Sequence, residues 1–132
     1  MKLITPELEA RFKEIGDQSE NENPLIVAKF FDPLGSATWY ATEYDKETNT
    51  CFGYATGMLE DEWGYFSVSE LESIQRFTTV VIDGVRHTSK LGLWIEREID
   101  FKEIRFYDLF PEKGRLAKLN NSKKEKSQDQ ER

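Results

Sequence analysis

Three strand candidates follow one another in the middle of the chain, and they limit the possible folds more than any other feature. Thr38–Tyr44, Cys51–Thr56 and Trp63–Val68 are rich in aromatic and β-branched residues, which suit a pleated, half-buried surface. Only short polar turns separate these runs. Consecutive strands with such short connections pair with their sequence neighbours, so the sequence predicts an antiparallel meander.

Side chains alternate between the two faces of a strand, which assigns residues of the meander to faces. In the first strand one face carries Thr38, Tyr40, Thr42 and Tyr44, and the other carries Trp39, Ala41 and Glu43. In the second strand the small residues Gly53 and Ala55 lie opposite the face of Phe52, Tyr54 and Thr56. We expect a helix or a neighbouring ring to lie across these two small residues.

The segment before the meander contains a helix and a strand. Thr5 is a candidate N-cap, Pro6 suits the first helical position, and Gly16 suits the end of the helix. An apolar stripe at spacings of four and three indicates the buried side, and it consists of Leu8, Phe12 and Ile15. Leu25–Asp32 is almost continuously apolar, which predicts one further strand.

The segment after the meander begins with a short helix at about residues 70–75, for which Ser69 is the candidate N-cap and Glu72 has the capping-box spacing. Phe77–Ile82 and Val85–Thr88 flank Asp83-Gly84, which is a two-residue hairpin signal. The last strand or pair of strands is expected within residues 94–106. A short helix interrupted by proline and glycine is expected at 106–119.

These elements together predict an α+β fold. We expect an antiparallel, strongly twisted sheet of five to seven strands, with the N-terminal helix and the short second helix packed on one face, and a partly closed barrel as the alternative. Residues 1–119 are expected to form a single globular domain. Residues 120–132 contain no apolar side chain that could offset the entropy of ordering, so we expect a disordered, charged tail.

The composition argues against several classes of protein. No run approaches the length of about 20 apolar residues that a membrane span needs, and the N-terminus lacks the apolar region of a signal peptide. Cys51 is the single cysteine, so no internal disulfide forms, and we interpret it as a small buried hydrophobe. The expected location is the cytoplasm, with no contact to a membrane.

Charge is distributed unevenly along the chain. Residues 1–111 carry 21 Asp and Glu against 11 Lys and Arg, whereas residues 112–132 carry four against seven. An acidic domain repels phosphates, so direct binding of nucleic acid is not expected. A basic protein partner, or imitation of nucleic acid by the acidic domain, remains open.

No standard catalytic or metal-binding motif is present. The chain has no phosphate-binding glycine loop, no nucleophile elbow and no paired Cys or His for zinc. The single histidine, His87, is expected at the surface beside the predicted hairpin turn, with nothing in the sequence to place a nucleophile next to it. The sequence therefore predicts no catalytic residue, no metal and no cofactor.

Arg97 stands out because strand alternation places it among apolar residues, while Glu96, Glu98 and Asp100 share the opposite face. A buried arginine needs a carboxylate or carbonyl partner, so a structural ion pair is one interpretation. The other is an anion-binding arginine in a pocket floor. In that hypothesis Arg97 converges on one concave pocket with Glu43 or Glu72 and with a tyrosine such as Tyr54 or Tyr65.

Several segments, taken in order, resemble a bacterial domain-of-unknown-function family, the DUF2958 type. They are Phe30-Phe31-x-Pro33, Trp39-Tyr40-Ala41-Thr42-Glu43, Phe52-Gly53-Tyr54, Gly64-Tyr65-Phe66-Ser67-x-Ser69-Glu70-Leu71-Glu72 and Gly92-Leu93-x-Ile95-Glu96-Arg97. The resemblance implies a gene carried on plasmids and integrative elements, and it implies no established activity. The chain departs from the family pattern in two places. Family members usually have only a short connection between the Leu-Glu helix and the Gly-Leu segment, where this chain has an apparent hairpin at Arg76–Lys90. They also tend to have Asp where this chain has Glu98.

Three functional hypotheses follow from the sequence and the resemblance. The first is a non-enzymatic cytoplasmic accessory protein of a mobile element that acts by contact with an unidentified protein partner. The second is an anti-restriction or anti-defence inhibitor in which the acidic domain imitates nucleic acid. The third is a small enzyme or ligand-binding domain with a pocket around Arg97.

Overall fold

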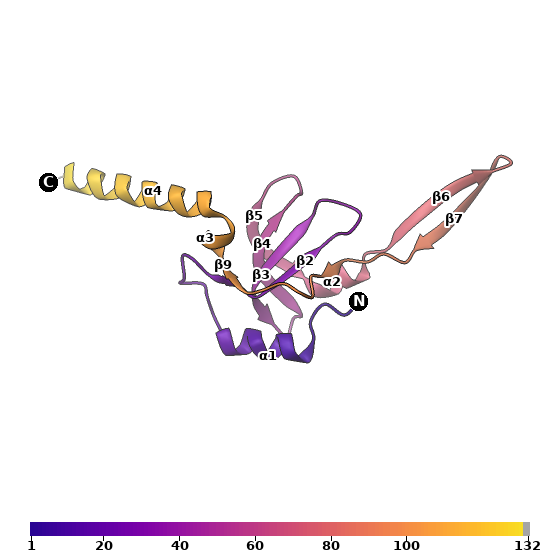
Figure 1. Ribbon diagram of the computed structural model, residues 1–132, viewed down its shortest axis with the longest axis horizontal. Helices are drawn as coiled ribbons and strands as arrows, with labels where there is room; N and C mark the ends of the chain where they lie inside the picture. Colours follow the sequence, from indigo (N-terminus) through magenta and orange to yellow (C-terminus); the bar gives the residue numbers. More distant parts are fainter. Residues whose placement is uncertain (131–132) are drawn as a thin grey trace.

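The computed structural model describes the backbone of residues 1–130 and the side chains through Lys123. Its centre is an antiparallel sheet in the order β5-β4-β3-β2-β8, and the predicted α+β class is confirmed (Figure 1). The five strands are β2 (Ala28–Phe31), β3 (Thr38–Asp45), β4 (Thr50–Thr56), β5 (Glu62–Ser67) and β8 (Glu96–Arg97). The two outermost strands do not pair with each other, so the described sheet does not form a closed barrel.

The meander predicted for β3, β4 and β5 is confirmed, but the apolar run before it is not one strand. It divides at Val27 into β1 (Leu25–Ile26), which pairs with β9 (Ile104–Arg105), and β2, which pairs with β3 and β8. The run is almost continuously apolar because its two halves supply different cores: Ile26 packs on one side of the sheet and Phe30 on the other.

Both predicted helices pack on one face of the sheet. Helix α1 (Pro6–Ile15) begins after Thr5, whose hydroxyl accepts the N–H of Leu8, and ends at Gly16 with φ 74°. Phe12 of α1 and Leu71 of the second helix lie in the same core as the sheet residues Phe30, Trp39 and Ala41. The predicted side of α1 is therefore confirmed.

The second helix, α2 (Val68–Ser73), begins earlier than predicted. Its N-cap is Ser67, which accepts the N–H of Glu70, and not Ser69. Ser69 instead accepts a hydrogen bond from the Asn49 side chain at 2.8 Å. No linker separates β5 from α2, because the last residue of β5, Ser67, is also the N-cap of the helix.

A β-bulge corrects the predicted faces of β3. Ala41 pairs with Gly53 and Glu43 pairs with Phe52, so Thr42 is an extra residue without a partner on β4. Past the bulge the alternation is inverted, because one extra residue moves every later side chain to the other face. Tyr44 therefore packs against Phe12 of α1, and Glu43 turns to the opposite face.

Gly53 is small for a different reason than predicted. The backbone of β3 comes so close that a Cβ on Gly53 would overlap the carbonyl group of Tyr40 and the Cα of Ala41. The space beside Gly53 is thus filled by neighbouring backbone and not by a helix or a ring. Ala55, in contrast, packs against the core on the helix-covered face, as expected.

The predicted hairpin is confirmed as β6 (Arg76–Ile82) and β7 (Val85–Leu91). Asp83 and Gly84 have φ values of 52° and 75°, the positive values that a two-residue turn of this kind needs. The hairpin projects away from the sheet, opposite the C-terminal helix (Figure 1).

The C-terminal segment is helical over a longer stretch than predicted. Helix α3 (Phe106–Leu109) ends at Phe110, whose backbone is not helical. Helix α4 then runs from Pro111 to Gln130 and is not interrupted at Gly114. The tail expected to be disordered from residue 120 is thus helical as far as it is described. The residues after Gly114 include many good helix formers and no proline or further glycine, so no local signal ends the helix. The boundary at residue 119 stays a prediction, and residues 131 and 132 lie outside the described residues.

The longest described helix is α4, and its residues are largely polar and charged. Across residues 1–130, no helix combines the length and the apolar character that a membrane span requires.

The cysteine lies in the core, as predicted. Cys51 is 0 % exposed, and burial raises the pKa of its thiol to about 12. At about pH 8 only about one thiol in ten thousand would then be ionised, and the thiolate is the reactive form. We expect iodoacetamide to leave the folded protein unmodified over a period in which the urea-unfolded protein reacts completely, as measured by intact mass. Similar labelling rates in the two states would contradict this.

Candidate functional site

Aromatic side chains form a row on the face of the sheet that α1 and α2 leave uncovered. Phe52 of β4 lies opposite Tyr65 of β5, and Tyr54 lies opposite Trp63 in the next pair but one. The Phe52 ring is stacked on Trp63, with ring centres 5.9 Å apart and an interplanar angle of 14°, and it meets Tyr65 edge-on at 4.9 Å. These four rings share one face because side chains alternate between the two faces along each of the neighbouring strands β4 and β5.

Only part of this row is covered by other elements. Tyr54 is buried under Phe106 of α3 and Phe110, the residue at which α3 ends. The centre of its ring lies 5.0 Å from that of Phe106 and 5.3 Å from that of Phe110. Trp63, in contrast, is 36 % exposed and Tyr65 is 79 % exposed. An exposed aromatic surface of this kind, next to a hollow, is a feature of contact sites.

Two cavities, of about 220 and 160 Å³, open beside the row, and both are lined by Glu43 and Phe52. We call the pair of cavities the groove. The first lies between the loop after α1 and the rings of Trp63 and Phe106. The second is bounded by the turn between β3 and β4 and by Tyr65.

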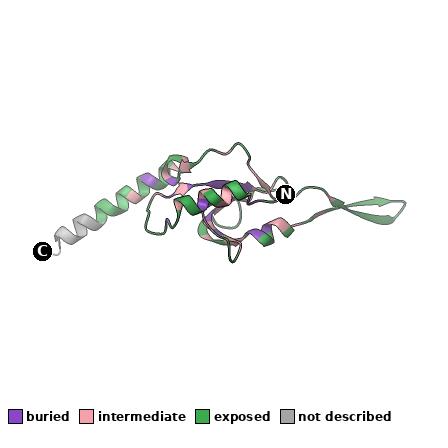
Figure 2. Ribbon diagram, turned by 90° about the horizontal axis from the view of Figure 1, so that it is seen from below, coloured by how far each residue is buried: buried purple, intermediate pink, exposed green. Residues whose placement is uncertain are grey.

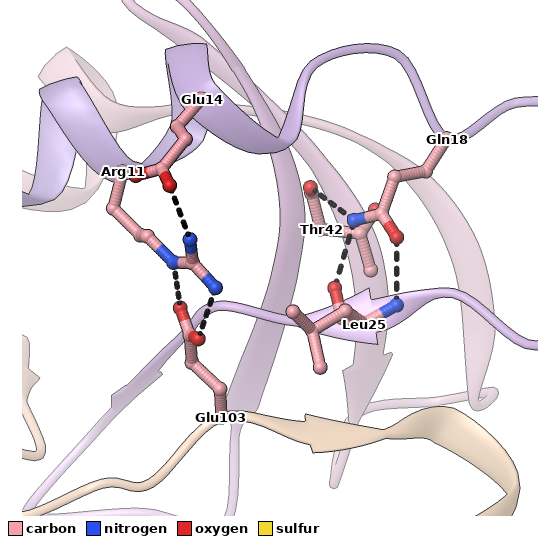
Figure 3. Close-up of polar contacts among 6 residues, drawn as sticks. All are labelled: Arg11, Glu14, Gln18, Leu25, Thr42 and Glu103. Atoms are coloured by element: carbon pink, nitrogen blue, oxygen red, sulfur yellow. Dashed lines mark hydrogen bonds and ion pairs between the residues drawn. The ribbon is translucent and has the colours of Figure 1, made fainter.

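Gln18 holds the loop that forms one wall of the groove. Its side-chain amide donates to the carbonyls of Leu25 and Thr42, both at 2.8 Å, and its amide oxygen accepts the N–H of Leu25 at 2.7 Å (Figure 3). The side chain is buried, so these bonds form in a place with little competing water. The loop is therefore fixed to β1 and β3.

The bulge in β3 supplies the partner that Gln18 needs. Thr42 is the residue left without a partner on β4, and its carbonyl accepts from the Gln18 amide. The hydroxyl of Thr42 donates to the carbonyl of Phe52 at 3.2 Å. Glu43, the next residue, accepts the backbone N–H of Gln18 at 2.6 Å and lies between the two cavities. The same irregularity thus positions the wall and the central carboxylate.

A second anchor holds α1 to the segment before β9. Arg11 makes a two-pronged pair with Glu103, with both N–O distances at 2.7 Å, and it also lies 3.3 Å from Glu14 (Figure 3). The hydrogen bonds from Arg11 lower the pKa of Glu103. This anchor fixes the helix that leads into the groove-forming loop.

The groove carries negative charge. Among the residues described as lining it, three are carboxylates, namely Glu22, Glu43 and Asp45, and none is lysine, arginine or histidine. Burial raises the pKa of Tyr107, and the hydrogen bond from its hydroxyl to Glu22 at 3.1 Å raises it further. This phenol therefore stays protonated and adds no charge at neutral pH.

Such an arrangement is suited to a cationic, partly apolar group. Carboxylates attract a cation, and the faces of Trp63, Phe52 and Tyr65 favour ammonium or guanidinium groups placed over them. Among the side chains that the structure describes, which end at Lys123, no cluster of three His, Cys, Asp or Glu has the geometry to hold a metal ion. The chemistry of the groove is thus one of binding through charge and aromatic contact.

The structure does not bring the five predicted ligand-binding residues together. Glu43 and Tyr65 share the second cavity of the groove, while Tyr54 is buried and lines neither cavity. Arg97 lies instead in a separate cavity of about 280 Å³ between α1 and β8. Glu72 lines neither the groove nor that cavity.

Arg97 and Glu72 both hold the same N-terminal residue. The Arg97 guanidinium donates to the carbonyl of Leu3 at 3.0 Å, and Glu72 accepts the N–H of Leu3 at 2.9 Å. Leu3 is fully buried, so its backbone groups need such partners. Of the two interpretations of Arg97, the structural one fits, but the partner is a carbonyl. No carboxylate lies within ion-pair distance of Arg97 among the side chains described.

Gln18, Phe52 and Trp63 are groove residues that the sequence did not identify as site residues. Gln18 lies in a polar loop without periodicity, and no local signal distinguishes it from its neighbours. The two rings carried a signal, since both lie on the same strand faces as Tyr54 and Tyr65. His87 is exposed on β7, as expected for a surface histidine.

Comparison with known proteins supplies a family but no functional precedent. The model of a family described as "Protein of unknown function (DUF2958)" matches residues 3–117. Searches among curated proteins and among solved structures gave no match.

Proposed function

The chain belongs to the DUF2958 family of proteins of unknown function, and within that family we propose that it is a binding protein that acts by contact with another protein. The groove is the contact site in this proposal, and a basic, partly apolar segment of the partner is its occupant. The observation that carries the proposal is the position of the Glu43 carboxylate between two cavities, one lined by the exposed Trp63 ring and the other by the exposed Tyr65 ring. No cationic side chain is among the residues described as lining them.

The biological setting belongs to the same proposal. We infer a cytoplasmic accessory protein of a bacterial mobile element, on the basis of the family resemblance and the acidic composition. Residues 1–111 carry a large excess of acidic residues, so long-range attraction would favour a basic partner.

The groove is tested with two substitutions that change its surface and leave its supports intact. Tyr65→Ala removes an exposed ring, and Glu43→Gln removes a charge but keeps an oxygen that accepts the Gln18 N–H. We expect each to weaken binding about tenfold, which corresponds to about 1.4 kcal/mol. The measurement is an NMR titration with a synthetic peptide of alternating arginine and valine, which is expected to shift the Trp63 indole signal.

Two matched substitutions outside the groove serve as controls. Leu59→Ala removes a fully exposed apolar side chain, and Glu47→Gln removes an exposed carboxylate in the β3–β4 turn. Both are expected to bind the peptide as the wild type does. Equal weakening by all four substitutions, or an equal response to a peptide of alternating glutamate and valine, would contradict the proposal. In the native host, the same stoichiometric partner should be captured by the wild type and the controls, and lost by the groove variants.

The nucleic-acid-mimic alternative stays a prediction without a specific observation in its favour. Mimicry requires carboxylates spaced like phosphates along one surface. Acidic side chains occur on α1, which Figure 1 shows below the sheet. They also occur at Glu60 and Asp61, in the loop between β4 and β5 at the top of that view, so these two groups do not form one surface. The hypothesis of a ligand pocket around Arg97 also stays a prediction. One N–H of that guanidinium is held by the Leu3 carbonyl, and the cavity beside it is also lined by Glu7 and Glu98.

A further inference from the structure

The β6–β7 hairpin stands apart from the rest of the molecule. Its two strands pair only with each other within the described chain, and the ion pair of Arg76 with Asp32 ties its base to the body. Five of its apolar side chains are more than half exposed: Phe77, Val80, Val81, Ile82 and Val85. The sixth, Leu91 at the base of β7, is partly buried. Figure 2 shows the hairpin exposed along its length.

A hairpin of this kind is not expected to remain unpaired. A two-stranded sheet without a packed face is marginally stable in water, and this one leaves both of its outer edges free. Neither the groove nor the rest of the body covers these apolar side chains. Addition of a further strand would supply hydrogen bonds and apolar cover at the same time.

The two edges of the hairpin differ in charge. The β7 edge carries Arg86, His87 and Lys90, and charged side chains on an edge strand discourage pairing. The β6 edge carries no charged residue from Phe77 to Ile82. The edge that is open to another strand is therefore β6.

We propose that β6 pairs in antiparallel fashion with β6 of a second copy of this chain, which joins two hairpins into a four-stranded sheet. The two-fold axis passes beside Thr79. Phe77 of each copy then lies opposite Val81 of the other, and Thr78 lies opposite Val80. Aromatic and β-branched pairs of this kind stabilise antiparallel sheets, and the symmetry forms each of them twice.

Charge favours this pairing over its alternative. Pairing of β7 with β7 about Thr88 would place Arg86 of one copy opposite Lys90 of the other, and like charges opposite each other are destabilising. Pairing of β6 with β6 opposes no like charges. It also places the two acidic bodies at opposite ends of a ribbon about 23 Å long, well beyond the screening length of about 8 Å at physiological salt.

The register of the hairpin provides a matched pair of substitutions. Thr79 and Thr88 face each other across the hairpin, with their hydroxyls 3.0 Å apart. The two-residue turn is closed by the Ile82–Val85 pair, so the alternation of the ladder points the N–H groups of Thr79 and Thr88 to the two free edges. A proline at either position removes one N–H that points to a free edge, and it removes the contact between the Thr79 and Thr88 hydroxyls. Neither proline removes a hydrogen bond between β6 and β7.

The test is the molar mass of the full chain in solution, measured by light scattering and sedimentation at about 1–100 μM, a range in which a moderate dimer would titrate. We expect the wild type to dimerise in this range, Thr79→Pro to raise the dimer dissociation constant at least tenfold, and Thr88→Pro to leave it within about threefold. Thr79→Lys and Thr88→Lys are expected to give the same contrast without altering the backbone.

Several results would overturn the proposal. A monomeric wild type at the highest concentration would do so, as would a dimer that survives both substitutions at Thr79. Equal loss of the dimer in the Thr79 and Thr88 variants would also contradict pairing through β6. A dimer that dissociates as salt is added would point to a basic hairpin docked on the acidic body of the other copy, because pairing of uncharged edges is not weakened by screening.

Discussion

Replacement of Gln18 by alanine is expected to lower the free energy of unfolding by about 3 kcal/mol. The substitution removes all three side-chain hydrogen bonds to Leu25 and Thr42, and it leaves the Thr42 carbonyl buried and the two Leu25 backbone groups partly buried without these partners. Each unsatisfied buried group costs about 1–3 kcal/mol, and relaxation of the loop recovers part of the sum. Urea denaturation monitored by tryptophan fluorescence measures the change in midpoint.

The same substitution should also weaken the groove. Gln18 fixes the loop that forms one wall, so its loss is expected to reduce binding of the arginine–valine peptide even at temperatures where the protein remains folded. Gln75→Ala is the matched control, because Gln75 is exposed, and we expect a change below about 0.5 kcal/mol. A Gln18→Ala protein as stable as the control would show that the three bonds contribute nothing net.

Replacement of Gly53 by alanine is expected to cost at least about 3 kcal/mol, at the upper end of the range for overpacking. The added methyl group would overlap the Tyr40 carbonyl and the Ala41 Cα, which are backbone atoms that cannot rotate away. Relief requires β3 and β4 to separate beside the bulge at Thr42, so the strand pair that carries Glu43 and Phe52 would be disturbed.

Gly64 provides an unusually close control for this substitution. It lies directly opposite Gly53 on β5, yet a Cβ at Gly64 would meet no atom within 4 Å. Gly64→Ala is therefore expected to be neutral or stabilising by up to about 1 kcal/mol, because alanine lowers the entropy of the unfolded chain. Thermal unfolding of both variants measures the contrast, and similar melting temperatures would disprove the close approach at Gly53.

Both substitutions act next to the bulge in β3, which connects the fold to the groove. The extra residue Thr42 brings its carbonyl to Gln18, and the inverted alternation turns Glu43 toward Phe52. Bulges are often found where a strand has to direct a side chain to a particular place. A substitution that removed the irregularity would be expected to return Glu43 to the face covered by α1.

Elements with local signals could be predicted from the amino-acid sequence alone. Helix α1 follows from Thr5, Pro6 and Gly16, since capping and backbone preference act within one turn of the chain. The β6–β7 turn follows from Asp83-Gly84, whose positive φ values few other residue pairs adopt easily. The meander and its aromatic faces follow from alternation and short turns, so half of the groove, the rings of β4 and β5, was within reach of sequence reasoning.

The other features could not be predicted in this way, because they depend on contacts between residues far apart in the chain. Gln18 bonds to Thr42 across 24 positions, Leu3 to Glu72 across 69, and Arg97 to Leu3 across 94. Nothing in the local sequence of Arg97 or Glu72 distinguishes a ligand-binding group from one that satisfies a buried backbone. The bulge likewise has no local signature, since an extra residue in β3 is recognised only against the register of β4.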